Sequence, residues 1–261
     1  MLKTKTPHLS ILLPLLILIL IALLFLREKI NIYTGNSQRL TSKAILPVNN
    51  TENDLSHYVG ERITYDVKMG GMRLGKASSN ILANEKLNGR SLNVMTMDTR
   101  LTNFNDSEKI YSDPKTLLPV KVERNILNFI SREKITEDYD QDNFTVTIIK
   151  RKGAKDQRLV IKKEGHINNA VLLPYYVRSL PALEVGKIIT ANLPTRNLEI
   201  KLVAIEDVKV PAGTFKAYRF QSTPKHITIW ISADERRIPL KIVGSGLMSY
   251  SMFMREYTPG S

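Results

Sequence analysis

The side chains able to do acid–base or metal chemistry are scattered along the chain. The four histidines stand dozens of residues apart, and no other ligand type recurs near them at metal-binding spacing; they are His8, His57, His166 and His226. Zinc and other transition metals need several such ligands at short, regular spacing. The sequence therefore predicts neither a metal centre nor a cofactor.

Nucleophile and phosphate-loop motifs are absent from the chain. It contains no cysteine, which excludes disulfides, thiolate catalysis, cysteine-ligated zinc and lipoprotein acylation. The segment Gly244-Ser245-Gly246 lacks the G-x-S-x-G frame, and Gly70-Gly71-Met72-Arg73-Leu74-Gly75 lacks phosphate-loop spacing and reads as a hairpin turn. No catalytic residue is predicted.

Adjacent carboxylates and nearby arginines leave alternatives open. Glu206-Asp207 and Asp234-Glu235 are neighbours on predicted strands, where consecutive side chains point to opposite faces. Asp234 is expected to cap a turn. Arg236 or Arg237 could neutralise Asp234 or Glu61 within the fold, or could bind an anionic ligand through two hydrogen bonds. Arg178 has the same two alternatives.

A run of basic side chains on a predicted hairpin suggests anion binding. Its core is Lys150, Arg151, Lys152 and Lys155, with Arg158, Lys162 and Lys163 behind it. No aromatic residue for base stacking stands between Phe144 and Tyr175, so nucleic acid is not expected. Anionic lipid headgroups or acidic envelope polymers are the predicted partners. The alternative is a solvated hairpin whose lysines prevent edge pairing.

The last predicted strand carries an apolar stripe that could contact a ligand. Met248, Tyr250, Met252 and Met254 recur at every second position, whereas Trp230 faces away from the isoleucines beside it. In a curled sheet one such face can line a cavity suited to acyl chains. The predicted ligand-binding residues are Trp230, Met248, Tyr250, Met252 and Arg178. The alternative is a sandwich covered by a helix.

Period-two patterning dominates the chain after Tyr58. Ile63, Tyr65, Val67 and Met69 alternate with polar residues, and Gly70-Gly71 supplies a turn. Similar alternation recurs near residues 198–202 and 227–232, separated by turn signals. Only residues 168–179 have helical spacing. We predict a mainly β fold, with one antiparallel, strongly curved or barrel-like domain and one short helix at 168–179.

The first residues predict a membrane anchor. Leu9 to Leu26 carries no charge, and a helix of this length covers about 27 Å, which suffices for a bilayer core. No signal-peptidase site follows it. We expect a cytoplasmic tail at 1–8, a transmembrane signal anchor at 9–26, a flexible linker at 27–56 and a β-rich domain at 57–261. This domain would lie in the periplasm of a bacterium, attached to the inner membrane by a single span.

Five blocks of the chain resemble the bacterial envelope family known as domain of unknown function 3108. In order, they are Val59-Gly60-Glu61-Arg62-Ile63-Thr64-Tyr65, Asp113-Pro114-Lys115-Thr116-Leu117-Leu118-Pro119, Tyr175-Tyr176-Val177-Arg178, Pro211-Ala212-Gly213-Thr214-Phe215 and Trp230-Ile231-Ser232-Ala233-Asp234-Glu235-Arg236-Arg237-Ile238-Pro239-Leu240. The resemblance implies an exported β-rich domain and no established activity.

These observations favour a non-catalytic binding module for an apolar or amphipathic ligand or for an envelope component. A structural protein that binds an anionic polymer through the basic hairpin is the alternative, and a glycan or lipid hydrolase is least favoured. Residues 57–261 carry 32 basic and 22 acidic side chains, which attract anionic partners or simply aid solubility. Trp230 is expected to be buried for stability, and Pro239 to lie at an edge or bulge.

Overall fold

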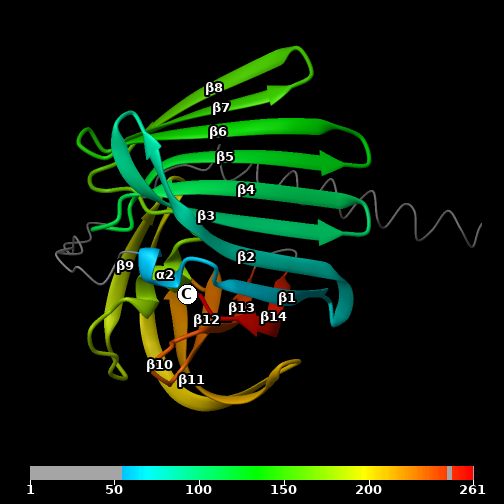
Figure 1. Ribbon diagram of the computed structural model, residues 1–261, viewed down its shortest axis with the longest axis vertical. Helices are drawn as coiled ribbons and strands as arrows, with labels where there is room; N and C mark the ends of the chain where they lie inside the picture. Colours follow the sequence, from blue (N-terminus) through cyan, green and yellow to red (C-terminus); the bar gives the residue numbers. More distant parts are fainter. Residues whose placement is uncertain (1–54, 246–248, 261) are drawn as a thin grey trace, which may run out of the picture. The chain divides into compact units, whose positions relative to one another are not determined.

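Fourteen antiparallel strands form one sheet (Figure 1). The structure, a computed structural model, describes residues 55–245 and 249–260. The short helices are η2 (Leu55–Tyr58) and α2 (Leu173–Arg178). The strands are β1 (Arg62–Met69), β2 (Met72–Leu87), β3 (Arg90–Leu101), β4 (Phe104–Ser112), β5 (Pro119–Asn128), β6 (Arg132–Asp140), β7 (Thr145–Lys152), β8 (Lys155–Lys162), β9 (Ile188–Leu193), β10 (Arg196–Val210), β11 (Gly213–Thr223), β12 (Ile227–Ser232), β13 (Pro239–Gly244) and β14 (Tyr250–Thr258).

The sheet consists of two meanders that meet in its middle. Its strand order runs from β8 down to β1 and then from β14 down to β9, so the first and last strands are neighbours. Short turns pair each strand with the next inside a meander, as the period-two pattern predicts. The antiparallel β fold is confirmed. The junction between β1 and β14 joins residues about 190 positions apart, such as Tyr65 and Met254.

Four turns of the first meander lie at the same end of the sheet, here called the hairpin end. They are residues 70–71, 102–103, 129–131 and 153–154, seen together in Figure 1. Strand register requires this arrangement, since Phe104 pairs with Asn128 and Glu133 pairs with Lys152. At the first turn Gly70 and Gly71 have φ of 55° and 83°, which favours glycine. The predicted hairpin turn is confirmed there.

The connection between the meanders, residues 163–187, runs from one edge strand of the sheet to the other. Gln141, in the β6–β7 turn, exchanges hydrogen bonds with the backbone of Ile167 at 2.9 Å in both directions. At the end of β9, the Asn168 backbone donates to the Asn192 carbonyl, and the Asn192 backbone donates to Asn168 Oδ1, both at 2.8 Å. The connection thereby links the two meanders at a second place, besides the β1–β14 ladder.

Helix α2 is shorter than the helix predicted for residues 168–179. The side chain of Asn169 accepts a hydrogen bond from the Val171 backbone at 2.8 Å, and Asn168 is paired with Asn192. Such local side-chain bonds compete with helix formation. Pro174 then stands in the first helical turn, where its missing N–H does no harm. All six residues of α2 are buried.

The core at the centre of the sheet joins β1 and β2 to the second meander, which begins at β14. It contains Ile63, Tyr65, Trp230, Leu240 and Met254 among others. In residues 55–245 and 249–260 no helix has the length and apolar character needed to cross a bilayer. The predicted tail, the anchor at Leu9 to Leu26 and most of the linker lie outside the described residues.

Candidate functional site

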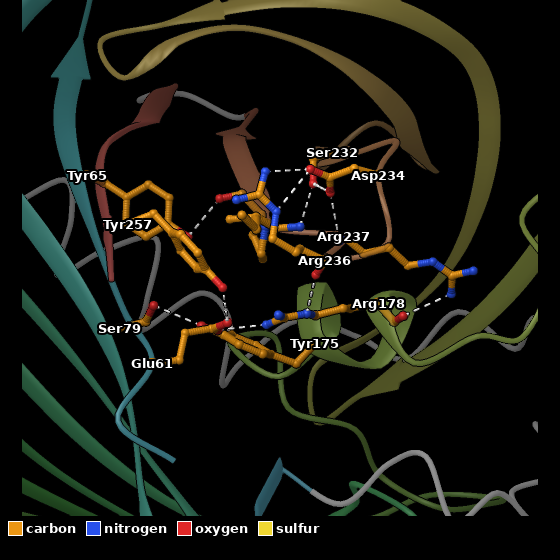
Figure 2. Close-up of polar contacts among 12 residues, drawn as sticks. Glu61, Tyr65, Ser79, Tyr175, Arg178, Ser232, Asp234, Arg236, Arg237 and Tyr257 are labelled. Atoms are coloured by element: carbon orange, nitrogen blue, oxygen red, sulfur yellow. Dashed lines mark hydrogen bonds and ion pairs between the residues drawn. The ribbon is translucent and has the colours of Figure 1, made fainter. Parts of the chain in front are cut away.

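Three of the recognisable sequence blocks meet in one polar network. Its members come from the start of β1, from α2, from the turn between β12 and β13, and from neighbouring strands (Figure 2). They are Glu61, Tyr65, Ser79, Tyr175, Arg178, Ser232, Asp234, Arg236, Arg237 and Tyr257. Because these blocks are far apart in the chain, only the folded sheet brings them together.

A buried ion pair between Glu61 and Arg178 is the centre of the polar network. Arg178 Nη1 lies 2.7 Å from Glu61 Oε1, and the side chains are 3 % and 1 % exposed. The hydroxyl of Tyr257 donates to the other carboxylate oxygen at 3.1 Å. Arg178 also donates to the Arg236 carbonyl at 2.8 Å, and its guanidinium lies 3.9 Å from the ring centroid of Tyr58. Arg178 was predicted either to pair within the fold or to bind an anionic ligand. In the structure it pairs with a carboxylate of the same chain.

Burial and charge act against each other at this pair. Burial disfavours the charged guanidinium of Arg178, but the hydrogen bond and charge of Glu61 outweigh it and raise the pKa. Burial, followed by the nearby Glu61 charge, raises the pKa of Tyr175. The Tyr175 hydroxyl donates to Ser79 Oγ at 2.8 Å and so ties α2 to β2.

Asp234 organises the turn between β12 and β13. It accepts hydrogen bonds from Ser232 Oγ at 2.6 Å, from the Arg237 backbone at 3.2 Å and from Arg236 Nη2 at 2.7 Å. Burial opposes the charge of Asp234, but the Ser232 and Arg236 bonds lower its pKa overall. The predicted turn cap is confirmed. Arg236 is the arginine that neutralises Asp234.

Arg237 connects this turn to the end of α2. Its backbone has φ of 47°, which is uncommon for a residue with a side chain. Its guanidinium donates to the carbonyls of Arg178 at 3.0 Å, Leu180, and Pro181 at 3.3 Å. These carbonyls belong to the last residue of α2 and to the residues just after it, where a cation is favourable. The polar network therefore fastens α2 to the sheet, and its carboxylates bind donors of the same chain.

Trp230 is buried, as predicted, at 9 % exposure. It belongs to the same core as Ile63 and Tyr65, and its indole donates to Glu206 Oε1 at 2.8 Å. Register places it opposite Lys241, whose amine lies 4.3 Å from the indole centroid. Pro239 opens β13 beside a register shift, which confirms its predicted place at a bulge.

Tyr250 and Met252 lie on the opposite face of the sheet from Trp230. Met252 pairs with Ile242, and Trp230 pairs with Lys241. Lys241 and Ile242 are consecutive in β13, so their side chains and those of their partners point to opposite faces. The predicted ligand residues thus divide between two faces, and Arg178 lies in the polar network. Met248 falls outside the described residues.

Five half-buried apolar side chains continue the core toward the hairpin end, and together they form what we call the apolar strip. They are Met69, Leu101, Phe104, Tyr250 and Met252. Cross-strand register places them on one face: Tyr250 pairs with Met69, and Leu101 pairs with Phe104. Leu101 and Met252 pack directly against the buried core.

The basic hairpin exists as predicted, formed by β7 and β8, but several of its charges have partners. Lys150 and Lys152 lie 2.8 and 3.1 Å from the carboxylate of Glu133, which is 2 % exposed. Arg151 pairs with Asp156 at 2.7 Å. Lys155 is exposed at the turn. Sequence reasoning missed Glu133 because it belongs to the neighbouring strand, where only register reveals the contact.

An exposed apolar turn beside this hairpin also escaped the sequence reasoning. Phe129 and Ile130, between β5 and β6, are 75 % and 67 % exposed. Asn128 Oδ1 accepts hydrogen bonds from the backbones of Ile130 at 3.0 Å and Ser131 at 2.8 Å. The pattern Asn-x-x-Ser around two apolar residues was the available signal, because Asn and Ser favour such turns.

A second ion-pair group fixes the junction of β1 with β14. Asp66, with a side chain 3 % exposed, lies 2.9 Å from Arg73 and accepts hydrogen bonds from both Nε and Nη2 of Arg255. The Arg255 hydrogen bonds, helped by the charges of both arginines and opposed by burial, lower the pKa of Asp66.

Comparisons with known proteins give a family and several distant structural likenesses. The model of the family described as "Protein of unknown function (DUF3108)" matches residues 64–249. A β-barrel-like protein of the DUF1849 family from Brucella abortus is 7 % identical, with a TM-score of 0.46, covering 78 % of this chain and 98 % of its own. A protein with a YmcC-like fold from Bacteroides fragilis is 11 % identical, with a TM-score of 0.28. The match covers 78 % of this chain and 99 % of that protein. No curated protein matches.

Proposed function

Because this chain belongs to the DUF3108 family, for which no activity is described, we propose a function from its own residues: a non-catalytic binding module for an apolar or amphipathic ligand. The apolar strip is the observation that carries this proposal. Its five side chains are half-buried on one face of the sheet, and two of them, Leu101 and Met252, pack against the core. An acyl chain laid against them would extend this core.

The side chains of the apolar strip suit a flexible apolar ligand. Methionine is unbranched and polarizable, so Met69 and Met252 can adapt to chains of different shape. Tyr250 adds an aromatic face to the strip. Burying one methylene group contributes about 0.8 kcal/mol, and micromolar binding corresponds to about 8 kcal/mol. Roughly ten methylene groups of a ligand must therefore contact the strip to reach micromolar affinity.

The polar network supports a binding role over a catalytic one. Glu61 and Asp234 accept hydrogen bonds from arginine, tyrosine and serine side chains of the same chain, and these bonds hold α2 against the sheet. A general acid or base must instead reach the substrate's proton. We place the module in the bacterial envelope, on the support of the apolar segment Leu9 to Leu26.

Uptake of a fluorescent fatty acid by the full-length, delipidated chain tests this proposal. We expect saturable binding that Met252→Glu or Leu101→Glu abolishes, because each places a carboxylate in the strip. Ile205→Glu is the matched control, since Ile205 is apolar and 44 % exposed but lies outside the strip. Absence of uptake by the folded parent chain, or equal loss in the control, would contradict the proposal.

A further inference from the structure

Two neighbouring turns at the hairpin end combine exposed apolar side chains with basic ones. The first is the 129–131 turn with Phe129 and Ile130, and the second is the 153–154 turn of the basic hairpin. Strand β6 joins them, since it follows the first turn and pairs with β7, which precedes the second. Glu133 pairs with Lys152, so both turns project past the same level of the sheet (Figure 1).

The apolar pair is held outward by a built turn. Asn128 Oδ1 accepts three hydrogen bonds, from Ile130 N at 3.0 Å, Ser131 N at 2.8 Å and Ser131 Oγ at 3.2 Å. The Asn128 backbone also donates to the Ser131 carbonyl at 3.0 Å. These bonds leave Phe129 and Ile130 at the apex. The two side chains are adjacent and together form an exposed apolar patch, a feature found at protein and membrane interaction sites.

The surroundings of this apex are strongly basic. Residues 127–134 and 150–157 contain six basic side chains and two acidic ones. The carboxylate of Glu133 is buried against Lys150 and Lys152, and that of Asp156 pairs with Arg151. Arg132, Lys134 and Lys155 are exposed. The potential around Phe129 and Ile130 is therefore positive.

We propose that these two turns, the docking tip, bind the surface of an anionic lipid bilayer. Phe129 and Ile130 would enter the boundary between headgroups and acyl chains, while Arg132, Lys134 and Lys155 contact anionic headgroups. Insertion of apolar side chains together with electrostatic attraction is the physical basis of interfacial binding. A soluble anionic polymer would satisfy the basic side chains but would leave the apolar apex in water.

The cysteine-free sequence allows a direct test in the full-length chain. Ala154→Cys, in the second turn, carries the polarity-sensitive dye NBD, and the chain is reconstituted in vesicles of equal parts phosphatidylcholine and phosphatidylglycerol. Doxyl-labelled phosphatidylcholine quenches the dye on contact. In one arrangement it is part of the vesicles that hold the chain, and in the other it is part of a second population of vesicles added to them. Val185→Cys with the same dye is the control, since Val185 is 59 % exposed but lies before β9, away from the hairpin end.

We expect the dye at position 154 to be quenched more strongly than the dye at position 185, either by quencher lipid in the vesicle that holds the chain or by quencher lipid in the added vesicles. The Phe129→Ser and Ile130→Ser pair should lower this quenching to the level of the control. Quenching equal to that at position 185 in both arrangements would overturn the proposal. So would a dye that responds to soluble polyphosphate but never to the quencher lipid, since this result assigns the tip to an anionic polymer.

The basic side chains are tested with a matched set of lysines. Arg132→Gln, Lys134→Gln and Lys155→Gln together should reduce quenching, as should replacing phosphatidylglycerol by phosphatidylcholine or adding salt. Lys201→Gln, Lys209→Gln and Lys216→Gln remove the same charge from exposed positions outside the tip and should leave it unchanged. Equal loss in both sets would show a general charge effect and contradict a localised docking tip. Uptake of the fluorescent fatty acid tests the apolar strip and does not depend on the docking tip, so the two proposals can fail independently.

Discussion

Replacing Arg178 by methionine tests the polar network most sharply. The substitution removes the 2.7 Å ion pair and leaves the Glu61 carboxylate, 1 % exposed, without its guanidinium partner. Breaking a buried pair on one side costs about 3–5 kcal/mol. That is a large part of the roughly 5–15 kcal/mol that stabilises a typical domain. With a urea dependence of about 2–3 kcal/mol per molar, the unfolding midpoint should fall by about 1–2 M.

Urea unfolding followed through the single tryptophan, Trp230, measures this change. The double variant Glu61→Leu with Arg178→Met should recover much of the loss, because an apolar pair of similar volume replaces the buried charges. Arg151→Met is the control, since its pair with Asp156 is 61 % and 47 % exposed, and its loss should leave the urea midpoint near that of the parent. The reasoning is refuted if Arg178→Met unfolds at the parent midpoint, or if the double variant is less stable than either single one.

Three further changes have distinct expected outcomes. Trp230→Ala should lower the free energy of unfolding by about 3–5 kcal/mol, whereas Arg236→Ala should change it by less than about 1 kcal/mol; circular dichroism during heating compares them, and equal melting temperatures would contradict burial as the role of the indole. The Arg255 hydrogen bonds lower the pKa of Asp66 and so stabilise the fold at any pH above the pKa of an unfolded aspartate, about 4. This stability is lost as the pH falls through the lower pKa of the folded state. Asp66→Asn should therefore weaken the fall of the urea midpoint at acid pH, and an unchanged fall would disprove this coupling. Gly75→Ala should destabilise by about 3 kcal/mol or more, because its Cβ would come within 2.0 Å of a backbone oxygen of β3, and a parent-like melting curve would show that the strands can separate there.

The strands were predictable because their signals are local. Alternation from Ile63 to Met69 followed by Gly70-Gly71 specifies a hairpin without knowledge of the rest of the chain. The pairing of β1 with β14 has no such signal, since no turn joins them. The predicted helix at 168–179 was too long. The spacing of its apolar residues gives no sign of the hydrogen bonds that Asn168 and Asn169 make in the structure.

The candidate site was predictable in its residue types but not in its partners. Arg178, Arg236 and Arg237 were recognised beside Glu61 and Asp234, and two alternatives stayed open for them. Geometry assigns Arg178 to Glu61 and Arg236 to Asp234. Arg178 reaches Glu61 across 117 positions, because the folded sheet places α2 beside the start of β1. Arg236 and Asp234, by contrast, meet within one turn.

The same principle explains the omissions. Glu133 lies outside the basic run, yet it is directly opposite Lys152 in the ladder. The apolar pair Phe129 and Ile130 would ordinarily be assigned to a core by composition, because hydrophobic side chains are usually buried. Only the position of the turn shows that they face solvent.

The junction of the first and last strands has a consequence for the order in which the chain can acquire its structure. During synthesis or export β1 emerges before any other strand, but its partner β14 emerges after all of them. The bonds from Arg255 to Asp66 and from Tyr257 to Glu61 close over 189 and 196 residues. Until then β1 presents an open edge, on which foreign strands can pair. Contacts of such range form slowly, so the first meander needs protection from aggregation until its last partner arrives.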